Sequence, residues 1–266
     1  MLFSRLIWCS LLTALLVGSV QFAVGHWRAM PIILAAEVFE SHMPQAGHVH
    51  AHEQTFATNH VHDLADSAGP TTGKRMALTW VAYVLYSFSM ALLMFAVMGW
   101  WIWKCGSRIG TARLALAVAA AGLLSMDIWP ALGLPAELPG MDAASLGSRQ
   151  AWWVLAAGSA ALACVVLAGA ALKNVATYWR WLAAATLLAL PFAVGAPQPL
   201  GDSLTGLDAK SLAQLQALEH EFARVTRWTF LSFWTSIAIA GGLVFARWLR
   251  PVIPAAERPL DGSVAA

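Results

Sequence analysis

Six stretches of the chain are apolar and almost free of charged residues, and polar segments separate them. They cover roughly residues 6–25, 76–103, 110–134, 151–172, 181–200 and 228–246. A helix needs about 20 predominantly apolar residues to cross the hydrocarbon core of a bilayer. The pattern therefore predicts an all-α integral membrane protein with a bundle of six transmembrane helices. If the third stretch, which contains Asp127, is re-entrant, the bundle has five.

The first stretch lies where a secretory signal peptide would lie, but we interpret it as a retained helix. Its apolar part is longer than an ordinary signal, and it lacks a clean cleavage pattern of small residues. Hydrophobic residues make up 59% of the 266 residues and charged residues 11%, which is typical of a membrane protein. We expect one transmembrane domain, 1–266, with a His-rich extracytoplasmic loop at 41–73 and a cytoplasmic tail at 251–266.

Basic residues are unevenly divided between the two sides of the predicted bundle. If the N-terminus is inside, the cytoplasmic segments hold nine basic residues and two acids, and the other side holds seven basic residues and twelve acids. Cytoplasmic loops of membrane proteins carry an excess of Lys and Arg. The distribution therefore predicts that both termini are cytoplasmic and that residues 26–75 face outward, which in a bacterial cell is the periplasm.

Proline and glycine interrupt the apolar pattern in two similar places, residues 130–140 and 191–201, with a fainter echo at 31–37. All three lie on the outer side, so they outline three outward-facing helical hairpins that would form parallel repeats. Interrupted apolar segments can mark a transport site, because their freed carbonyls can line a polar cavity. The alternative is ordinary helix-ending turns at the membrane interface.

Six of the eight histidines fall within one loop, between the first two apolar stretches; they are His42, His48, His50, His52, His60 and His62. In an extended segment alternate residues point the same way, so three of these imidazoles can converge on one point. Neutral imidazole binds Co, Ni, Cu and Zn. The loop is therefore predicted to bind a transition metal, and the alternative is a solvated loop that makes no use of its histidines.

Four carboxylates are candidate metal ligands beside this loop. Glu37 and Glu40 would share one face of a helix just before the histidines, unless they mark a solvated helix end. Asp127 lies within an apolar stretch, where a charge costs up to about 3 kcal/mol, so we expect it to face the bundle interior or water. Its alternative is an interfacial position beside Trp129. Glu137 lies within the first Pro/Gly-interrupted segment.

Several motifs of other protein classes are missing. Residues 69–75 approach a phosphate-binding loop but have one residue too few between the glycines, so no nucleotide site follows. The paired histidine motifs of membrane di-iron enzymes do not occur, and nothing predicts an enzyme or a nucleic-acid partner. Cys9, Cys105 and Cys164 form no metal-binding pair, and we interpret them as small apolar side chains.

Along most of its length the chain resembles the CbtA-type cobalt transporter subunits. The segments that carry the resemblance are PIILAAEVFE at 31–40, the His-rich loop, WPALGLPAELPG at 129–140, RQAWW at 149–153 and PFAVGAPQP at 191–199. The resemblance implies a bacterial inner-membrane component of cobalt uptake, in a family usually described with five spans. It also implies a small single-span membrane partner that carries its own histidines.

Together these features predict a permease subunit for uptake of a divalent transition-metal cation. Cobalt is the ion that the resemblance implies, and nickel or zinc would fit the same ligands. The loop would capture the ion, and Glu37, Glu40 and either Asp127 or Glu137 would pass it on. The competing hypothesis is a membrane protein that binds metal without transporting it, as a sensor or as an accessory subunit that presents metal to a carrier.

Overall fold

The computed structural model describes residues 2–35, 71–106, 109–136, 144–169, 176–198 and 209–253, and within these ranges the regular elements are helices. In chain order they are α1 (Leu2–Arg28), α3 (Thr71–Cys105), α4 (Thr111–Gly122), η2 (Leu123–Ile128), α5 (Trp129–Ala131), α6 (Leu146–Ala168), α7 (Thr177–Val194), α8 (Ala209–Val244), η3 (Phe245–Leu249) and η4 (Arg250–Val252). The predicted all-α architecture is confirmed.

Five helical segments are long and apolar enough to cross a membrane: Leu2–Ala35, Gly73–Cys105, Thr111–Ala131, Leu146–Ala168 and Ala213–Val252. The third expected stretch is one of them, since α4, η2 and α5 form one continuous helical segment. The expected span that is not among the five is α7, which has 18 residues and contains Arg180 and Pro191. The structure thus has five or six membrane-crossing helices, and the sixth depends on α7.

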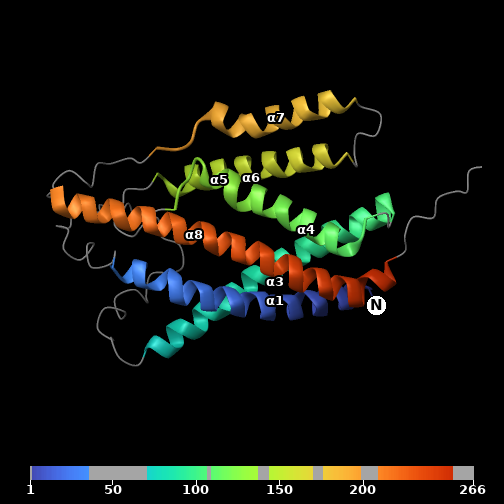
Figure 1. The fold of residues 1–266 in the computed structure, drawn as a ribbon, viewed down its shortest axis with the longest axis horizontal. Coiled ribbons are helices and arrows are strands. Elements are labelled where there is room, and N and C mark those ends of the chain that lie inside the picture. Colours follow the sequence, from blue (N-terminus) through green and yellow to red (C-terminus); the bar gives the residue numbers. More distant parts are fainter. Residues whose placement is uncertain are drawn as a thin grey trace, which may run out of the picture.

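Successive helices alternate in direction (Figure 1). We call the end of the bundle that lies away from the N-terminus the distal end. The first span, α5 and α7 end there, and α3, α6 and α8 begin there. The described chain leaves the distal end at Ala35 and returns at Thr71, so the segment that contains the His-rich loop is connected to this end.

A continuous apolar core joins α1, α3, α4 and α8. It includes Phe95 and Phe245, whose ring centroids lie 5.8 Å apart and which are at most 1% exposed. Close approach of α1 and α3 depends on Gly18, because a β-carbon there would lie 2.8 Å from the Val84 Cα atom. Small residues allow such close packing in lipid, where burial from water gives no driving force.

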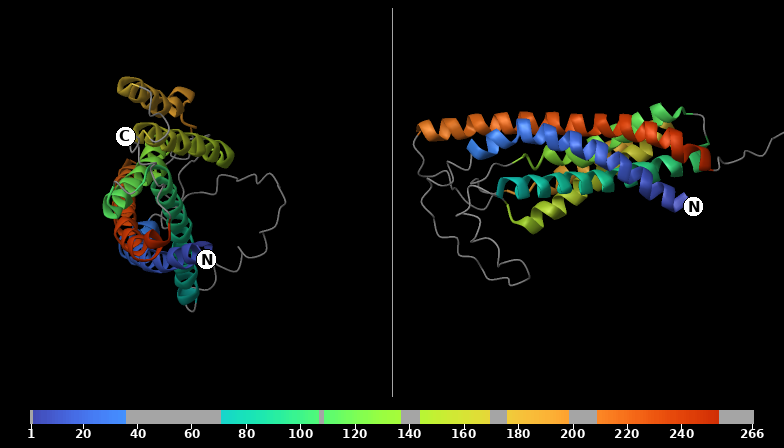
Figure 2. Two further views of the ribbon diagram at one scale, coloured as in Figure 1. Left: turned by 90° about the vertical axis from the view of Figure 1, so that its right-hand side faces the viewer. Right: turned by 90° about the horizontal axis from the view of Figure 1, so that it is seen from below.

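The α6–α7 pair lies to one side of this core, as the end-on view of Figure 2 shows, and contributes no described residue to it. At the end of the pair opposite the distal end, the Arg180 side chain of α7 donates hydrogen bonds to the carbonyl oxygens of Val166, at 3.2 Å, and Leu167. Because the last carbonyls of a helix have no partner within it, Arg180 caps α6. This interaction explains a charged residue near the start of an otherwise apolar helix.

The expected stretch 228–246 lies within the candidate span Ala213–Val252, and helix α8 begins well before that stretch. Leu215, Leu218, Phe222 and Val225 recur at helical spacing and pack against Ile32, near the end of the first span. This amphipathic first part of α8 contains too many polar residues to be recognised from the sequence as part of a membrane span. With 36 residues, α8 is about 54 Å long, and so it extends well beyond a bilayer core of about 30 Å.

Candidate functional site

Asp127 lies where the helix of the third span widens. Leu123–Ile128 is a π-helical stretch, and the Trp129 amide donates to the carbonyl of Leu124, five residues earlier. Pro130 follows and has no N–H with which to continue the hydrogen-bond ladder. Turns of this kind are frequent at functional sites. Asp127 is 9% exposed, so it faces the bundle interior, which was one of the two sequence expectations.

The hydrogen-bond partner of Asp127 is Trp234 of α8. The indole Nε1 of Trp234 donates a hydrogen bond to Oδ2 of Asp127. A buried carboxylate that lacks a partner is costly, so the indole stabilises it in place. The Trp234 ring packs on Gly122, where a β-carbon would lie 2.1 Å from a ring carbon. Gly122 therefore leaves room for the ring that holds Asp127.

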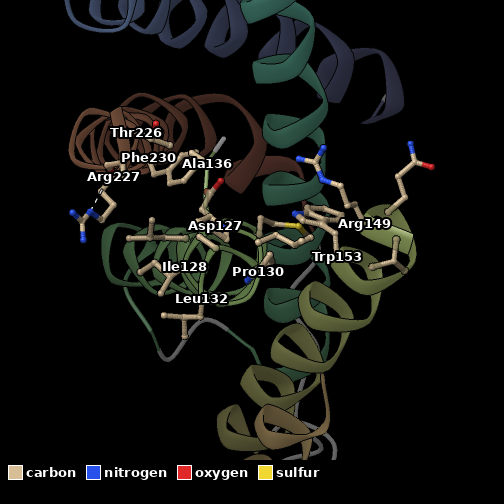
Figure 3. Close-up of a pocket in the computed structure, with 18 of the residues that line it drawn as sticks. Asp127, Ile128, Pro130, Leu132, Ala136, Arg149, Trp153, Thr226, Arg227 and Phe230 are labelled. Atoms are coloured by element: carbon tan, nitrogen blue, oxygen red, sulfur yellow. Dashed lines mark hydrogen bonds between the residues drawn. The ribbon is translucent and has the colours of Figure 1, made fainter. Parts of the chain in front are cut away.

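Asp127 lines an open cavity of about 1040 Å³ between the third span, the beginning of α6 and the middle of α8 (Figure 3). Most of the lining is apolar, and its polar members are Asp127, Arg149, Gln150, Thr226 and Arg227. Since a water molecule occupies about 30 Å³ in the liquid, the cavity has ample room for a hydrated ion. It also lies toward the distal end, because α5 ends and α6 begins there.

Two arginines flank the carboxylate in this cavity. Arg149 and Arg227 lie on opposite sides of Asp127 in Figure 3, and Arg227 Nε donates to the Ala223 carbonyl at 3.2 Å. Their charges oppose the approach of a bare cation, so Asp127 alone does not make the cavity a strong cation site. Ala136 also lines the cavity. The next residue in the sequence is a second acid, Glu137.

Two tryptophans link the described parts of the two Pro/Gly-interrupted segments at the distal end. Trp129 Nε1 donates to the Leu188 carbonyl at 3.1 Å, and Trp152 Nε1 donates to the Pro191 carbonyl at 3.1 Å. Phe192 packs edge-on against both indoles, with centroid distances of 5.5 and 5.9 Å. The carbonyls around Pro191 therefore bind indole N–H groups, and they do not line the cavity.

Gly133 allows the Trp152 ring to pack closely against the end of the third span. A β-carbon at Gly133 would lie 2.1 Å from the Trp152 ring, so only glycine admits the ring beside the end of α5. The glycine of the first interrupted segment and the proline of the second thus contact the same tryptophan. In the structure these two residues join helices, as the interface-turn alternative allows, and the predicted repeat of three hairpins stays a prediction.

Asp127 is the one predicted ligand that falls within the described ranges. The others lie outside them: Glu37, Glu40, Glu137, His42, His48, His50, His52, His60 and His62. Within the described ranges no group of three or more His, Cys, Asp or Glu side chains is placed to hold a metal ion. Metal binding by the loop therefore stays a prediction.

Sequence reasoning missed Trp234, Arg149 and Arg227 as members of the site. Trp234 lies in the middle of an apolar span, where a tryptophan carries no local sign of a buried polar partner. A carboxylate in an apolar span does indicate that a hydrogen-bond donor from another helix lies close to it. The sequence does not show which of the 14 tryptophans provides that donor.

No solved structure and no curated protein matches the chain. One protein family does match it, over residues 3–246 of the 266, and this family is described as probable cobalt transporter subunit (CbtA). The matched range contains the interrupted segments and all the helices from α1 to α8 except the first residue of α1. The resemblance inferred from the sequence is confirmed, and the chain belongs to the CbtA family of probable cobalt transporter subunits.

Proposed function

We propose that this chain is the permease subunit through which a divalent transition-metal cation, cobalt, enters the cell. The observation that carries the proposal is the Asp127 carboxylate, which lines a cavity inside the bundle and is held there by the Trp234 indole. Ionisable groups within membrane spans are costly and usually mark a substrate pathway. Family membership supports cobalt as the cargo, and nickel or zinc would suit the same oxygen and nitrogen ligands.

The distal end is the proposed outer entrance. The excess of basic residues in the segments at the opposite end supports this orientation. The His-rich loop, 41–73, then lies outside, where its imidazoles capture the ion and raise its concentration beside the bundle. Both the loop and the cavity belong to the distal end, which supports transfer from one to the other.

Acids outside the described ranges complete the proposed route. Glu37 and Glu40 follow Ala35 at the end of the first span, and Glu137 follows the cavity residue Ala136. Their charges offset those of Arg149 and Arg227 and make the entrance attractive to a cation. Asp127 is the last carboxylate of the relay before the ion passes between the helices.

The proposed assembly includes a second membrane protein. The family is described as a transporter subunit, which implies a partner. The partner that we propose is a small single-span protein with histidines on the outer side, where it shares the captured ion. The chain has no nucleotide-binding motif, so the energy for uptake has to come from a source other than ATP hydrolysis by this subunit.

Uptake of radioactive cobalt and nickel by cells that express the chain with its proposed partner tests the function. Asp127→Asn and Glu137→Gln are expected to abolish uptake, whereas replacing the six loop histidines by Ala weakens it at low metal concentration only. A flexible loop raises the supply of ions, but rigid elements hold a dehydrating ion. Glu219→Gln, on α8 outside the cavity lining, is the matched control and should leave uptake unchanged. Full-rate uptake by Asp127→Asn would contradict the relay.

A specific observation favours a second function, a membrane protein that binds metal without transporting it. Among the described residues of the apolar stretches, Asp127 is the one acid, and one carboxylate beside two arginines is a weak path for a cation. In proteoliposomes that contain the chain and its partner, metal binding without entry into the lumen would establish this alternative.

A further inference from the structure

A second cavity at the distal end lies between the first span and α8. Its volume is about 660 Å³, and its lining includes Trp27, Arg28, Glu221, Arg224 and Trp228. It shares no lining residue with the cavity of Asp127. None of its described lining residues belongs to the proposed metal route, although Glu37 and Glu40 of that route follow the lining residue Ala35 in the sequence.

The charge pattern of the two helices places this cavity at the membrane surface. No Lys, Arg, Asp or Glu lies between Arg5 and Arg28 in the first span, or between Arg227 and Arg247 in the last. At 1.5 Å per residue each run covers about 30 Å, the thickness of the hydrocarbon core. Arg28 therefore lies at the boundary of the core, and Arg224 lies one helical turn outside it.

Two exposed tryptophans also indicate that the cavity lies at the membrane surface. Trp27 is 82% exposed and Trp228 is 65% exposed, and each lies beside the arginine that ends its apolar run. Indole rings concentrate at the level of the lipid head groups, where one part of the ring is apolar and its N–H is wet. The cavity thus opens among lipid phosphates.

The described lining of this cavity is basic. Arg28 forms no ion pair within the described part of the chain, and Arg224 pairs with Glu221 at 3.4 Å on the surface of its own helix. An exposed pair of this kind is weak and easily exchanged. Guanidinium groups bind phosphate oxygens in a two-pronged geometry, so two arginines from different helices form a suitable phosphate site.

We propose that this cavity binds the head-group phosphate of an anionic phospholipid between Arg28 and Arg224. The acyl chains of the lipid lie against the apolar surface of the two helices below Trp27 and Trp228. Basic pockets between transmembrane helices hold anionic head groups on the cytoplasmic side of membranes, and the same guanidinium–phosphate contacts can form at this outer end. The bound lipid joins the end of the first span to the part of α8 that leaves the membrane.

Lipid retention by the full-length protein tests the site. The protein is purified in mild detergent, supplied with phosphatidylglycerol or phosphatidylcholine, and examined by native mass spectrometry. Wild type should retain phosphatidylglycerol preferentially. The double variant Arg28→Gln/Arg224→Gln should lose affinity for it by about fivefold per arginine, and Glu221→Gln should strengthen retention. The control is Arg5→Gln/Arg247→Gln, which removes two basic residues from the opposite end and should change nothing at this site.

The outcomes decide between a lipid site and its alternatives. Equal retention of both lipids by wild type overturns the proposal, and this measurement is informative even if the double variant does not fold. Equal loss in the double variant and the control overturns it too, because the effect would then be general charge attraction. Displacement of the lipid by millimolar inorganic phosphate would show a site for a free anion, which also overturns the lipid assignment.

Discussion

The four-helix core and the α6–α7 pair are held in place by different kinds of contact. In the core, α1, α3, α4 and α8 interlock through buried apolar side chains such as Met94, Met98 and Ile237. Helix α7 packs along α6, and it contacts the third span through the hydrogen bond from Trp129 to the Leu188 carbonyl and through the Phe192 ring on Trp129. Closely packed apolar side chains resist movement of one helix against another. A small number of hydrogen bonds and ring contacts holds a helix in one position but can be replaced by similar contacts in another position.

Asp127 lies where these two regions meet. Its partner Trp234 belongs to the core, but the cavity that it faces is also lined by Arg149 and Trp153 of α6. A transporter has to open a site alternately to its two sides, by movement of one part of the bundle against another. From this difference we expect the core to be the fixed part of a transport cycle, and α6 with α7 to be the moving part.

The largest expected effect comes from Gly122→Ala, beside the core residue Trp234. The new β-carbon would lie 2.1 Å from the Trp234 ring, which is 4% exposed and has little room to move. Overpacking of this kind costs up to about 3 kcal/mol. Thermal unfolding in detergent measures the loss. The control is Gly158→Ala in α6, where a β-carbon meets nothing within 4 Å, and equal destabilisation by both changes would remove the distinction between the regions.

A smaller loss of about 2 kcal/mol is expected from Trp234→Phe, which leaves the Asp127 carboxylate buried without its donor. Trp248→Phe, an exposed tryptophan on the same helical segment, is the control and should have little effect. The double change Asp127→Leu/Trp234→Phe removes both partners and should restore part of the stability. If the double variant is instead as unstable as the sum of the two single changes, the pair makes no specific contribution.

The smallest effect on stability is expected from Trp152→Phe, which removes one hydrogen bond to the Pro191 carbonyl, worth about 1 kcal/mol. Its consequence should be local, with faster hydrogen–deuterium exchange in α7 and unchanged exchange in α3. Trp179→Phe, at an exposed position of α7, is the matched control. Faster exchange throughout the bundle would show that α7 is part of one cooperative unit with the core.

The sequence predicts the helices well where burial in lipid alone decides the outcome. Stretches 76–103, 110–134 and 151–172 correspond to α3, to α4 with η2 and α5, and to α6. It fails for the first half of α8, since Leu215, Leu218 and Phe222 are separated by polar residues and fall below any membrane threshold. Their helical spacing was the available signal, and it indicates packing against another helix.

The candidate site was predictable only in part. The cost of a charge within an apolar stretch pointed to Asp127 as an interior residue. Its pairing with Trp234 depends on helix packing between residues far apart in the chain, which no local pattern encodes. The roles of Gly122 and Gly133 likewise follow from an indole ring that packs on each of them, and the sequence alone presents both as ordinary small residues.

The pairing of Asp127 with Trp234 also bears on how the protein is made. The two residues are 107 positions apart, and the second belongs to α8, which is synthesised later than the third span. At about 5–20 residues per second, the carboxylate waits for about 5–20 s before its donor is synthesised. During this interval the third span carries an unpaired acid that is poorly suited to lipid. The acid of the third span therefore gains its hydrogen-bond donor only after α8 has been synthesised.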